Sequence, residues 1–221
     1  YVYQYYDKLA RPGPDVVRYK ALVFGADETE WRPSAVKPML SPNQGFEHEN
    51  HFLMYIPYKG QYVVLYECGW YHPDGTGKYG RYLADIRLAH SRDGERFTRI
   101  CPHEATISIG EPGEWDGQFL VISDKAVIKD DTIFLYYCGQ GADWTSWPWQ
   151  NATPGDRTVN PMTGRSGIGN IGLSRMGLAT LRVDRFTSLS NEDRRSFGSF
   201  TTRPFRVPPD RGRELRINLS R

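Results

Sequence analysis

The chain has 221 residues, of which 24% are charged and 39% hydrophobic, a balance typical of a globular protein rather than a disordered one. Its formal net charge of +2 is too small to indicate a nucleic-acid surface, and no run of about 18 apolar residues predicts a membrane-spanning helix. We therefore expect neither nucleic acid nor membrane as a partner. The three cysteines form no even disulfide framework and leave the compartment open.

Short apolar runs rich in β-branched and aromatic residues recur along the chain and predict β-strands. In chain order they are Tyr19–Phe24, Phe52–Ile56, Tyr62–Tyr66, Ile86–His90, Phe119–Ile122, Ala126–Ile128, Ile133–Tyr137 and Leu178–Val183. Turn-forming residues separate them, and no segment keeps an apolar stripe at helical spacing with caps at both ends. The pattern therefore predicts an all-β chain, which could be a sandwich, a barrel or a propeller.

An internal repeat favours the propeller. Gly60–Gly69 and Asp130–Gly139 both read as a turn, an apolar strand and the sequence Leu-Tyr-x-Cys-Gly, at an offset of 70 residues without a gap. A second repeat follows each copy, because Leu88–Phe97 matches Leu178–Phe186 once one residue is skipped. A β-sandwich with accidental similarity is the alternative. We favour four-stranded blades because two separate repeats keep the same order.

Three segments resemble parts of known propeller glycosidases. Ser91–Phe97 is similar to their S-x-D-G-x-x-W hairpin. Gly113–Gly117, followed by Val127–Tyr137, resembles the opening of one of their blades. Gly177–Leu189, followed by Gly198–Pro204, is similar to the end of the propeller in bacterial family-32-like proteins. The chain thus resembles glycoside hydrolases of the family 32, 43 and 68 type.

This resemblance implies a partial five-bladed β-propeller, with about three blades represented, over residues 1–190. Residues 191–221 would then form a linker and the first strand of a C-terminal β-sandwich, at Glu214–Asn218. No segment like W-M-N-D-P-N-G supplies the acid of the first blade, and the opening of the chain looks internal. We therefore expect a fragment that lacks one or more N-terminal blades and that associates with missing blades or with itself.

Cleavage of a glycosidic bond needs two carboxyl groups, one of them protonated and the other ionised. In a propeller the inner strands of successive blades converge on the axis, so acids that precede these strands can meet. Glu49 precedes one such strand and Asp116 precedes the next. These two are the candidate catalytic pair. Asp124 is the reserve candidate, because it lies about where family 43 enzymes place their general acid.

Seven further side chains are candidates for binding the substrate. They are Glu47, His51, Asp85, Trp115, Trp144, Trp147 and Trp149. The last three lie in the long loop Gln140–Asn170, where exposed indoles would suit the C–H faces of a sugar ring. Some of the candidates have structural alternatives. His51 could be a satisfied polar core residue, Asp116 a structural hairpin acid, and the indoles of the loop could pack against a neighbouring blade.

Glu67-Cys68 resembles the Glu-Cys acid motif of family 32. It lies in the second strand of its repeat, where the other copy has Tyr137, so we interpret the match as accidental.

Three functions remain open. The first is a furanosidase-like glycoside hydrolase that cleaves oligo- or polysaccharides with paired carboxylates and without an organic cofactor. The second is a glycoside phosphorylase of the same architecture, which would need Arg, Lys or His at the site. The third is a non-catalytic carbohydrate-binding propeller. The absent first-blade acid favours the third for this chain, whereas the resemblance favours the first for the whole protein. No zinc-ligand spacing predicts a metal site.

Overall fold

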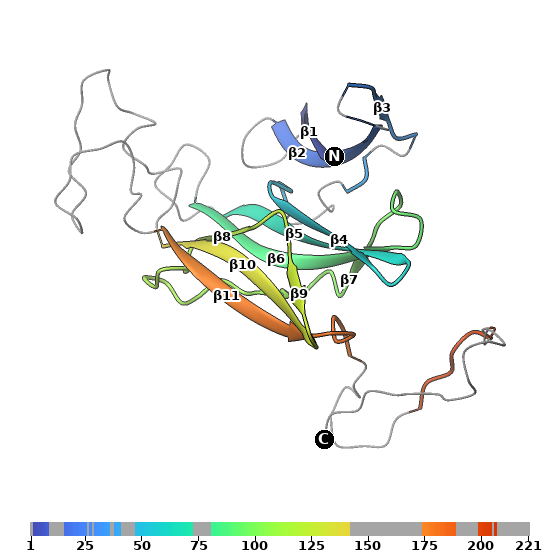
Figure 1. Ribbon diagram of the computed structural model, residues 1–221. Helices are drawn as coiled ribbons and strands as arrows, with labels where there is room; N and C mark the ends of the chain where they lie inside the picture. Colours follow the sequence, from blue (N-terminus) through green and yellow to red (C-terminus); the bar gives the residue numbers. More distant parts are fainter. Residues whose placement is uncertain are drawn as a thin grey trace. The chain divides into compact units, whose positions relative to one another are not determined.

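A computed structural model describes residues 2–8, 16–25, 27, 29–35, 38–40, 47–72, 81–141, 174–188, 199–204 and 206, with side chains from residue 19 onward (Figure 1). Within these ranges the only regular elements are β-strands, so the predicted all-β class is confirmed. The described residues contain no helix of the length and apolar character needed to cross a membrane.

The chain divides into two compact units, residues 1–184 and 185–221. Every strand among the described residues belongs to the first unit. The described part of the second unit, residues 185–188, 199–204 and 206, contains no strand. The predicted division after residue 190 stays a prediction, and Glu214–Asn218 lies outside the described residues.

The N-terminal strands form a sheet of their own (Figure 1). Strand β1 (Val2–Lys8) pairs antiparallel with β2 (Val16–Gly25), and β2 pairs antiparallel with β3 (Trp31–Pro33). The apolar side chains of β2 are buried at Ala21, Leu22 and Val23. This sheet therefore packs through its middle strand.

The next four strands form an antiparallel meander. They are β4 (Leu53–Tyr58), β5 (Gln61–His72), β6 (Arg81–Ser91) and β7 (Thr98–Ile100), and each pairs with the one that follows it. Residues 63–69 of β5 and 82–89 of β6 are buried throughout, so both faces of these two strands are covered. This is the strand order that the sequence predicts for one blade.

A second meander repeats the beginning of the first. Strands β8 (Phe119–Ile122) and β9 (Val127–Lys129) pair antiparallel with different parts of β10 (Thr132–Gln140). Together they take the place of one strand that is interrupted by a bend. Strand β10 then pairs with β11 (Ser174–Arg182). Strands β5 and β10, which carry the 70-residue repeat, are thus each the second strand of their meander. The number of blades in a complete propeller stays a prediction.

Two hydrophobic clusters connect these parts. Residues before and within the first meander pack as one buried cluster of Leu22, Met39, Leu40, Val64, Tyr66, Cys68 and Ala89. A second cluster of Tyr82, Ala84 and Phe119 lies where β6 meets β8 in a parallel pairing of Ala84 with Phe119. Burying each large apolar side chain contributes about 1.5–3 kcal/mol. The first cluster therefore holds β2 and residues 39–40 against the first meander, and the second holds the two meanders together.

Candidate functional site

Glu49 and Asp116 approach the two repeat glycines in different ways. Glu49 pairs with Gly69 through its backbone, whereas the backbone partner of Gly139 is Leu120 and Asp116 approaches Gly139 with its side chain. Before β4, Glu49 exchanges backbone hydrogen bonds with Gly69 at the end of β5, at 2.8 and 3.0 Å. Gly139 is the repeat partner of Gly69, and a Cβ added there would lie 2.5 Å from the Cβ of Asp116. Each acid therefore lies against the glycine that ends Leu-Tyr-x-Cys-Gly in its own repeat.

The carboxylate of Glu49 is held by a tyrosine. Glu49 is 7% exposed, and the Tyr71 hydroxyl donates a hydrogen bond of 3.0 Å to its Oε1. The His48 ring packs edge-on against Tyr71, with ring centroids 5.1 Å apart. Tyr71 therefore holds the Glu49 carboxylate in one orientation.

A second glutamate lies behind this pair. The buried Tyr82 hydroxyl donates a 2.5 Å hydrogen bond to Oε1 of Glu67, and the Tyr71 and Tyr82 rings are 5.1 Å apart. Burial, followed by the charges of Glu67 and Glu49, raises the pKa of Tyr82 well above its usual value. Tyr82 therefore remains a neutral donor at physiological pH.

The sequence analysis interpreted the Glu67-Cys68 match as accidental and did not predict the contact between Glu67 and Tyr82. The available signal was strand periodicity, because Glu67, Gly69 and Tyr71 alternate along β5 and share one face. The paired residue of Tyr71 on β6 is Tyr82. Glu49, Glu67, Tyr71 and Tyr82 form the network that we call the glutamate–tyrosine cluster.

Glu47 is anchored away from this cluster. It is 2% exposed, and its Oε1 accepts a 3.1 Å ion-pair contact from Arg99 and a hydrogen bond from Asn50. Arg99 also donates to the Tyr66 hydroxyl at 3.0 Å and lies over the Tyr66 ring. These contacts give Glu47 a structural role, and its predicted contact with substrate stays a prediction.

Asp85 and His51 are likewise occupied by neighbours. Asp85 receives two hydrogen bonds from the Arg87 guanidinium, at 2.7 and 2.8 Å, and both side chains are buried. The His51 ring stacks on the Phe52 ring with centroids 4.3 Å apart, and the backbone carbonyl of His51 accepts a hydrogen bond from Lys20 of β2. The buried, bidentate Asp85–Arg87 pair holds strand β6 in position, because removing either partner would leave the other charge buried and unpaired.

Asp116 lies among aromatic rings and a second acid. Trp115 stacks on Tyr137 with centroids 5.9 Å apart, and burial followed by the Asp116 charge raises the pKa of Tyr137. The carboxylates of Asp116 and Glu114 both approach Gly110, where a side chain would collide with them. Asp116 is half-buried, which leaves it accessible to a ligand.

The remaining candidates lie elsewhere. Asp124 is exposed in the bend between β8 and β9, so strand β8 separates it from Asp116. Trp144, Trp147 and Trp149 lie outside the described residues. Across the described part of the chain, no group of three or more His, Cys, Asp or Glu side chains could hold a metal ion.

Comparisons with known proteins give remote structural likeness only. No family model and no curated protein matches the chain. Two solved structures, a glycoside hydrolase and a BT0996 RGII complex, are 15% and 16% identical, each with a TM-score of 0.46 over 81% of this chain. The chain spans 40% of the length of both. A glycosyl hydrolase from Bacteroides ovatus is 22% identical with a TM-score of 0.37, covering 49% of this chain and 34% of its own. Likeness at this level is too remote to identify a family or an activity.

Proposed function

We propose that this chain supplies a carboxylate pair, Glu49 and Asp116, for the hydrolysis of glycosidic bonds in oligo- or polysaccharides. The observation that supports the proposal is that each acid lies against the last glycine of its own repeat, Glu49 through its backbone and Asp116 through its side chain. Equivalent positions of successive blades point toward a common axis in a propeller. Hydrolysis of a glycosidic bond requires two carboxyl groups that approach one bond from different sides.

The two acids lie in different surroundings. Glu49 accepts a hydrogen bond from the Tyr71 hydroxyl, which holds its carboxylate in place. Asp116 is half-buried beside the Trp115–Tyr137 stack, so its carboxylate remains accessible to a leaving group. We assign the role of base or nucleophile to Glu49 and that of general acid to Asp116.

The glutamate–tyrosine cluster positions the base. Glu67 is 1% exposed and therefore does not reach a substrate, but it fixes the Tyr82 hydroxyl. The Tyr82 ring in turn packs against Tyr71, the donor to Glu49. Glu67 and Tyr82 are thus positioning residues. The motif resemblance favours a furanoside as the substrate. The long loop Gln140–Asn170, which contains Trp144, Trp147 and Trp149, would border its binding site.

A non-catalytic carbohydrate-binding propeller is the second candidate. It is favoured by the burial of Glu49, whose 7% exposure leaves little surface for a substrate. The two candidates differ in one measurable respect: a binding protein retains the sugar unchanged, whereas a hydrolase releases new reducing ends.

The experiment incubates the protein with furanoside and pyranoside oligosaccharides and measures reducing ends with and without inorganic phosphate. Hydrolysis predicts release that is independent of phosphate, and phosphorolysis predicts a sugar phosphate instead. The variants Asp116→Asn and Asp124→Asn then distinguish the acids. We expect Asp116→Asn to lower turnover ~100-fold or more and Asp124→Asn to leave it near the wild-type value. The reverse result would assign the acid role to Asp124, and binding without cleavage would favour the second candidate.

A further inference from the structure

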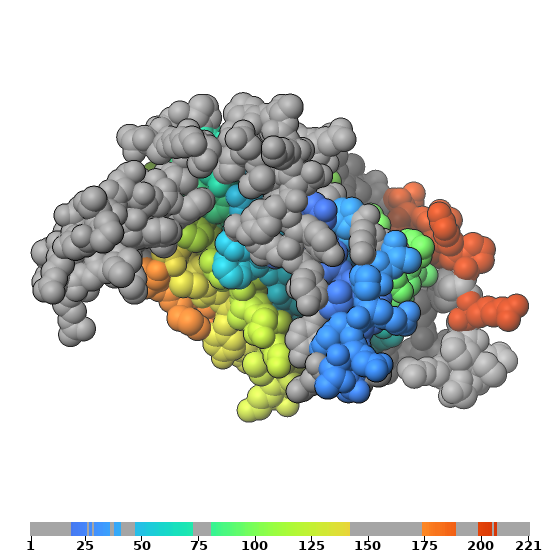
Figure 2. Space-filling model, turned by 90° about the horizontal axis from the view of Figure 1, so that it is seen from above, coloured from blue at the N-terminus to red at the C-terminus, as the bar shows by residue number. Residues whose placement is uncertain are grey.

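One face of the second meander is apolar and exposed, and we call it the β10–β11 face. Paired residues of an antiparallel sheet share a face, and Tyr136 of β10 pairs with Leu178 of β11. The face continues through the pair of Phe134 with Val127 onto β9. Its exposed apolar side chains are Val127, Tyr136, Met176 and Leu178, at 50%, 38%, 73% and 51% exposure. Figure 2 shows β10 and β11, in yellow and orange, side by side at the molecular surface.

The corresponding face of the first meander is buried. Leu65 is the fifth residue of β5, as Tyr136 is of β10, and both strands begin directly after a hairpin turn. Leu65 pairs with Leu88, which the second sequence repeat aligns with Leu178. This correspondence by strand position has an offset of 71 residues, one more than the sequence repeat of the two strands. Leu65 and Leu88 are 1% and 5% exposed, so this face of the first meander is covered.

The second meander provides that cover. Tyr82 lies on the covered face of β6, and its ring packs against Phe119 of β8 with centroids 5.7 Å apart. At the other end of the face, Asp184 follows β11 and accepts a 2.9 Å hydrogen bond from the Tyr58 hydroxyl. Lys59, in the β4–β5 turn, forms an ion pair with the same carboxylate. A neighbouring sheet therefore covers this face of the first meander.

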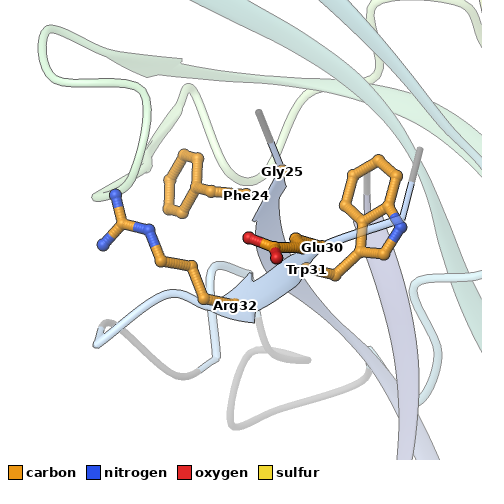
Figure 3. Close-up of a pocket in the computed structure, with 5 residues that line it drawn as sticks. All are labelled: Phe24, Gly25, Glu30, Trp31 and Arg32. Carbon is orange, nitrogen blue, oxygen red and sulfur yellow. The ribbon is translucent and has the colours of Figure 1, made fainter. Parts of the chain in front are cut away.

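The N-terminal sheet covers the opposite face of the first meander. Leu22 of β2 belongs to one buried cluster with Val64 and Tyr66 of β5, and Phe24 packs against that cluster. Figure 3 shows Phe24 on one side of the β2–β3 hairpin and Trp31 on the other, so the hairpin meets the first meander with its Phe24 side. Each face of the first meander thus packs against a sheet. The β10–β11 face is the next in this series, and a sheet is the kind of surface that fits it.

We propose that the β10–β11 face binds the same face of a second copy of this chain, as a sheet-on-sheet dimer. Its charged side chains, Lys129 and Arg182, lie at the end next to the β9–β10 turn, and Asp131 pairs with Arg182 at 2.8 Å. A two-fold axis that runs across the strands places this end over the uncharged end of the second copy, where Cys138 pairs with Met176. Like charges therefore do not meet across the contact.

The size of the face sets the expected strength of the dimer. The four exposed apolar side chains offer roughly 400 Å² per copy, against ~800 Å² per partner in a standard interface. We expect a reversible dimer with a dissociation constant on the order of 10–100 µM. The proposal does not depend on the carboxylate pair, because the Trp115–Tyr137 stack beside Asp116 lies on the other face of β10.

Sedimentation velocity of the full chain between about 5 and 500 µM tests the proposal. We expect the average mass to rise from that of a monomer to that of a dimer and no further, because a two-fold contact occupies the face in both copies. Leu178→Asp should weaken the dimer about tenfold or more. Met176→Asp changes the most exposed side chain of the face, so the fold should persist, and it should weaken the dimer by a similar factor.

Ile128→Asp is the matched control. Ile128 is 46% exposed, close to the 50% of its neighbour Val127, but it pairs with Ile133 and lies on the opposite face of β9. Ile128→Asp should leave the dimer intact, whereas Val127→Asp should weaken it severalfold. The proposal is wrong if the chain stays monomeric at the highest concentration, or if Met176→Asp dimerises as well as the wild type. It is also wrong if Ile128→Asp weakens the dimer as much as Val127→Asp, or if the mass grows beyond a dimer, which would indicate edge-to-edge pairing of strands.

Discussion

Replacing Gly69 with alanine tests whether the close approach of Tyr82 to β5 holds the glutamate–tyrosine cluster together. A Cβ at Gly69 would lie 2.7 Å from Cζ and 2.9 Å from Cε2 of Tyr82, and closer still to its hydroxyl. Tyr82 is 2% exposed and packs against Phe119, so its ring has no free space to enter. The added methyl group must therefore displace the ring and its hydrogen bond to Glu67.

Two costs add in this variant. Overpacking a filled core costs about 1–3 kcal/mol, and the loss of a hydrogen bond to a charged group costs about 1.5–3 kcal/mol. We expect Gly69→Ala to lower the free energy of unfolding by roughly 2.5–6 kcal/mol, measured by urea denaturation with linear extrapolation. Gly60→Ala is the control, because nothing lies within 4 Å of its added Cβ. Its positive φ of 76° alone should cost about 1–2 kcal/mol.

A double variant isolates the contact. Combining Gly69→Ala with Tyr82→Phe removes the hydroxyl that is nearest to the new methyl group, so part of the stability should return relative to the sum of the single effects. The reasoning is refuted if Gly69→Ala unfolds within about 1 kcal/mol of the wild type, because the ring could then move freely.

Two further outcomes are expected. Tyr82→Phe removes the hydroxyl that donates to the buried Glu67 carboxylate. Urea denaturation should show a free energy of unfolding that is lower by about 1–3 kcal/mol. A change below about 0.5 kcal/mol would contradict the hydrogen bond. Backbone hydrogen bonds, first from Arg96, lower the pKa of Asp93 below its usual 3.8. The pKa of Asp93 is lower in the folded than in the unfolded chain, so its carboxylate contributes to the free energy of unfolding above pH 3.8, and this contribution is lost as the pH falls further. Asp93→Asn should therefore flatten the acid side of the curve of unfolding free energy against pH.

The apolar runs predicted eight of the eleven described strands, and β1, β3 and β7 were not predicted. Strand boundaries were harder to predict, because β5 runs to His72 and β6 begins at Arg81, beyond the apolar runs that predicted them. The two strands pair along their whole length, and this ladder extends each of them into residues of weak β-propensity. Pairing of this kind depends on the partner strand and cannot be inferred from either segment alone.

The candidate site stays a prediction, and the structure supplies its neighbours. The repeat placed Glu49 and Asp116 before corresponding strands, and each lies against the last glycine of its own repeat. The hydrogen bond from Tyr82 to Glu67 could not be inferred from the sequence, because it depends on how β6 pairs with β5. Asp85 is held by Arg87, two residues along the same strand, and its contact with substrate stays a prediction.

The turnover number of Glu49→Gln tests the central claim most directly. Glutamine keeps the size of the side chain and can still accept the Tyr71 hydroxyl, so the fold should persist while the ionisable carboxyl is lost. Glu104→Gln, at an exposed acid of the turn after β7, is the matched control. We predict that Glu49→Gln slows oligosaccharide hydrolysis ~100-fold or more while Glu104→Gln retains the wild-type rate. A Glu49→Gln variant that hydrolyses its substrate at the wild-type rate would contradict the assignment of Glu49 to the carboxylate pair.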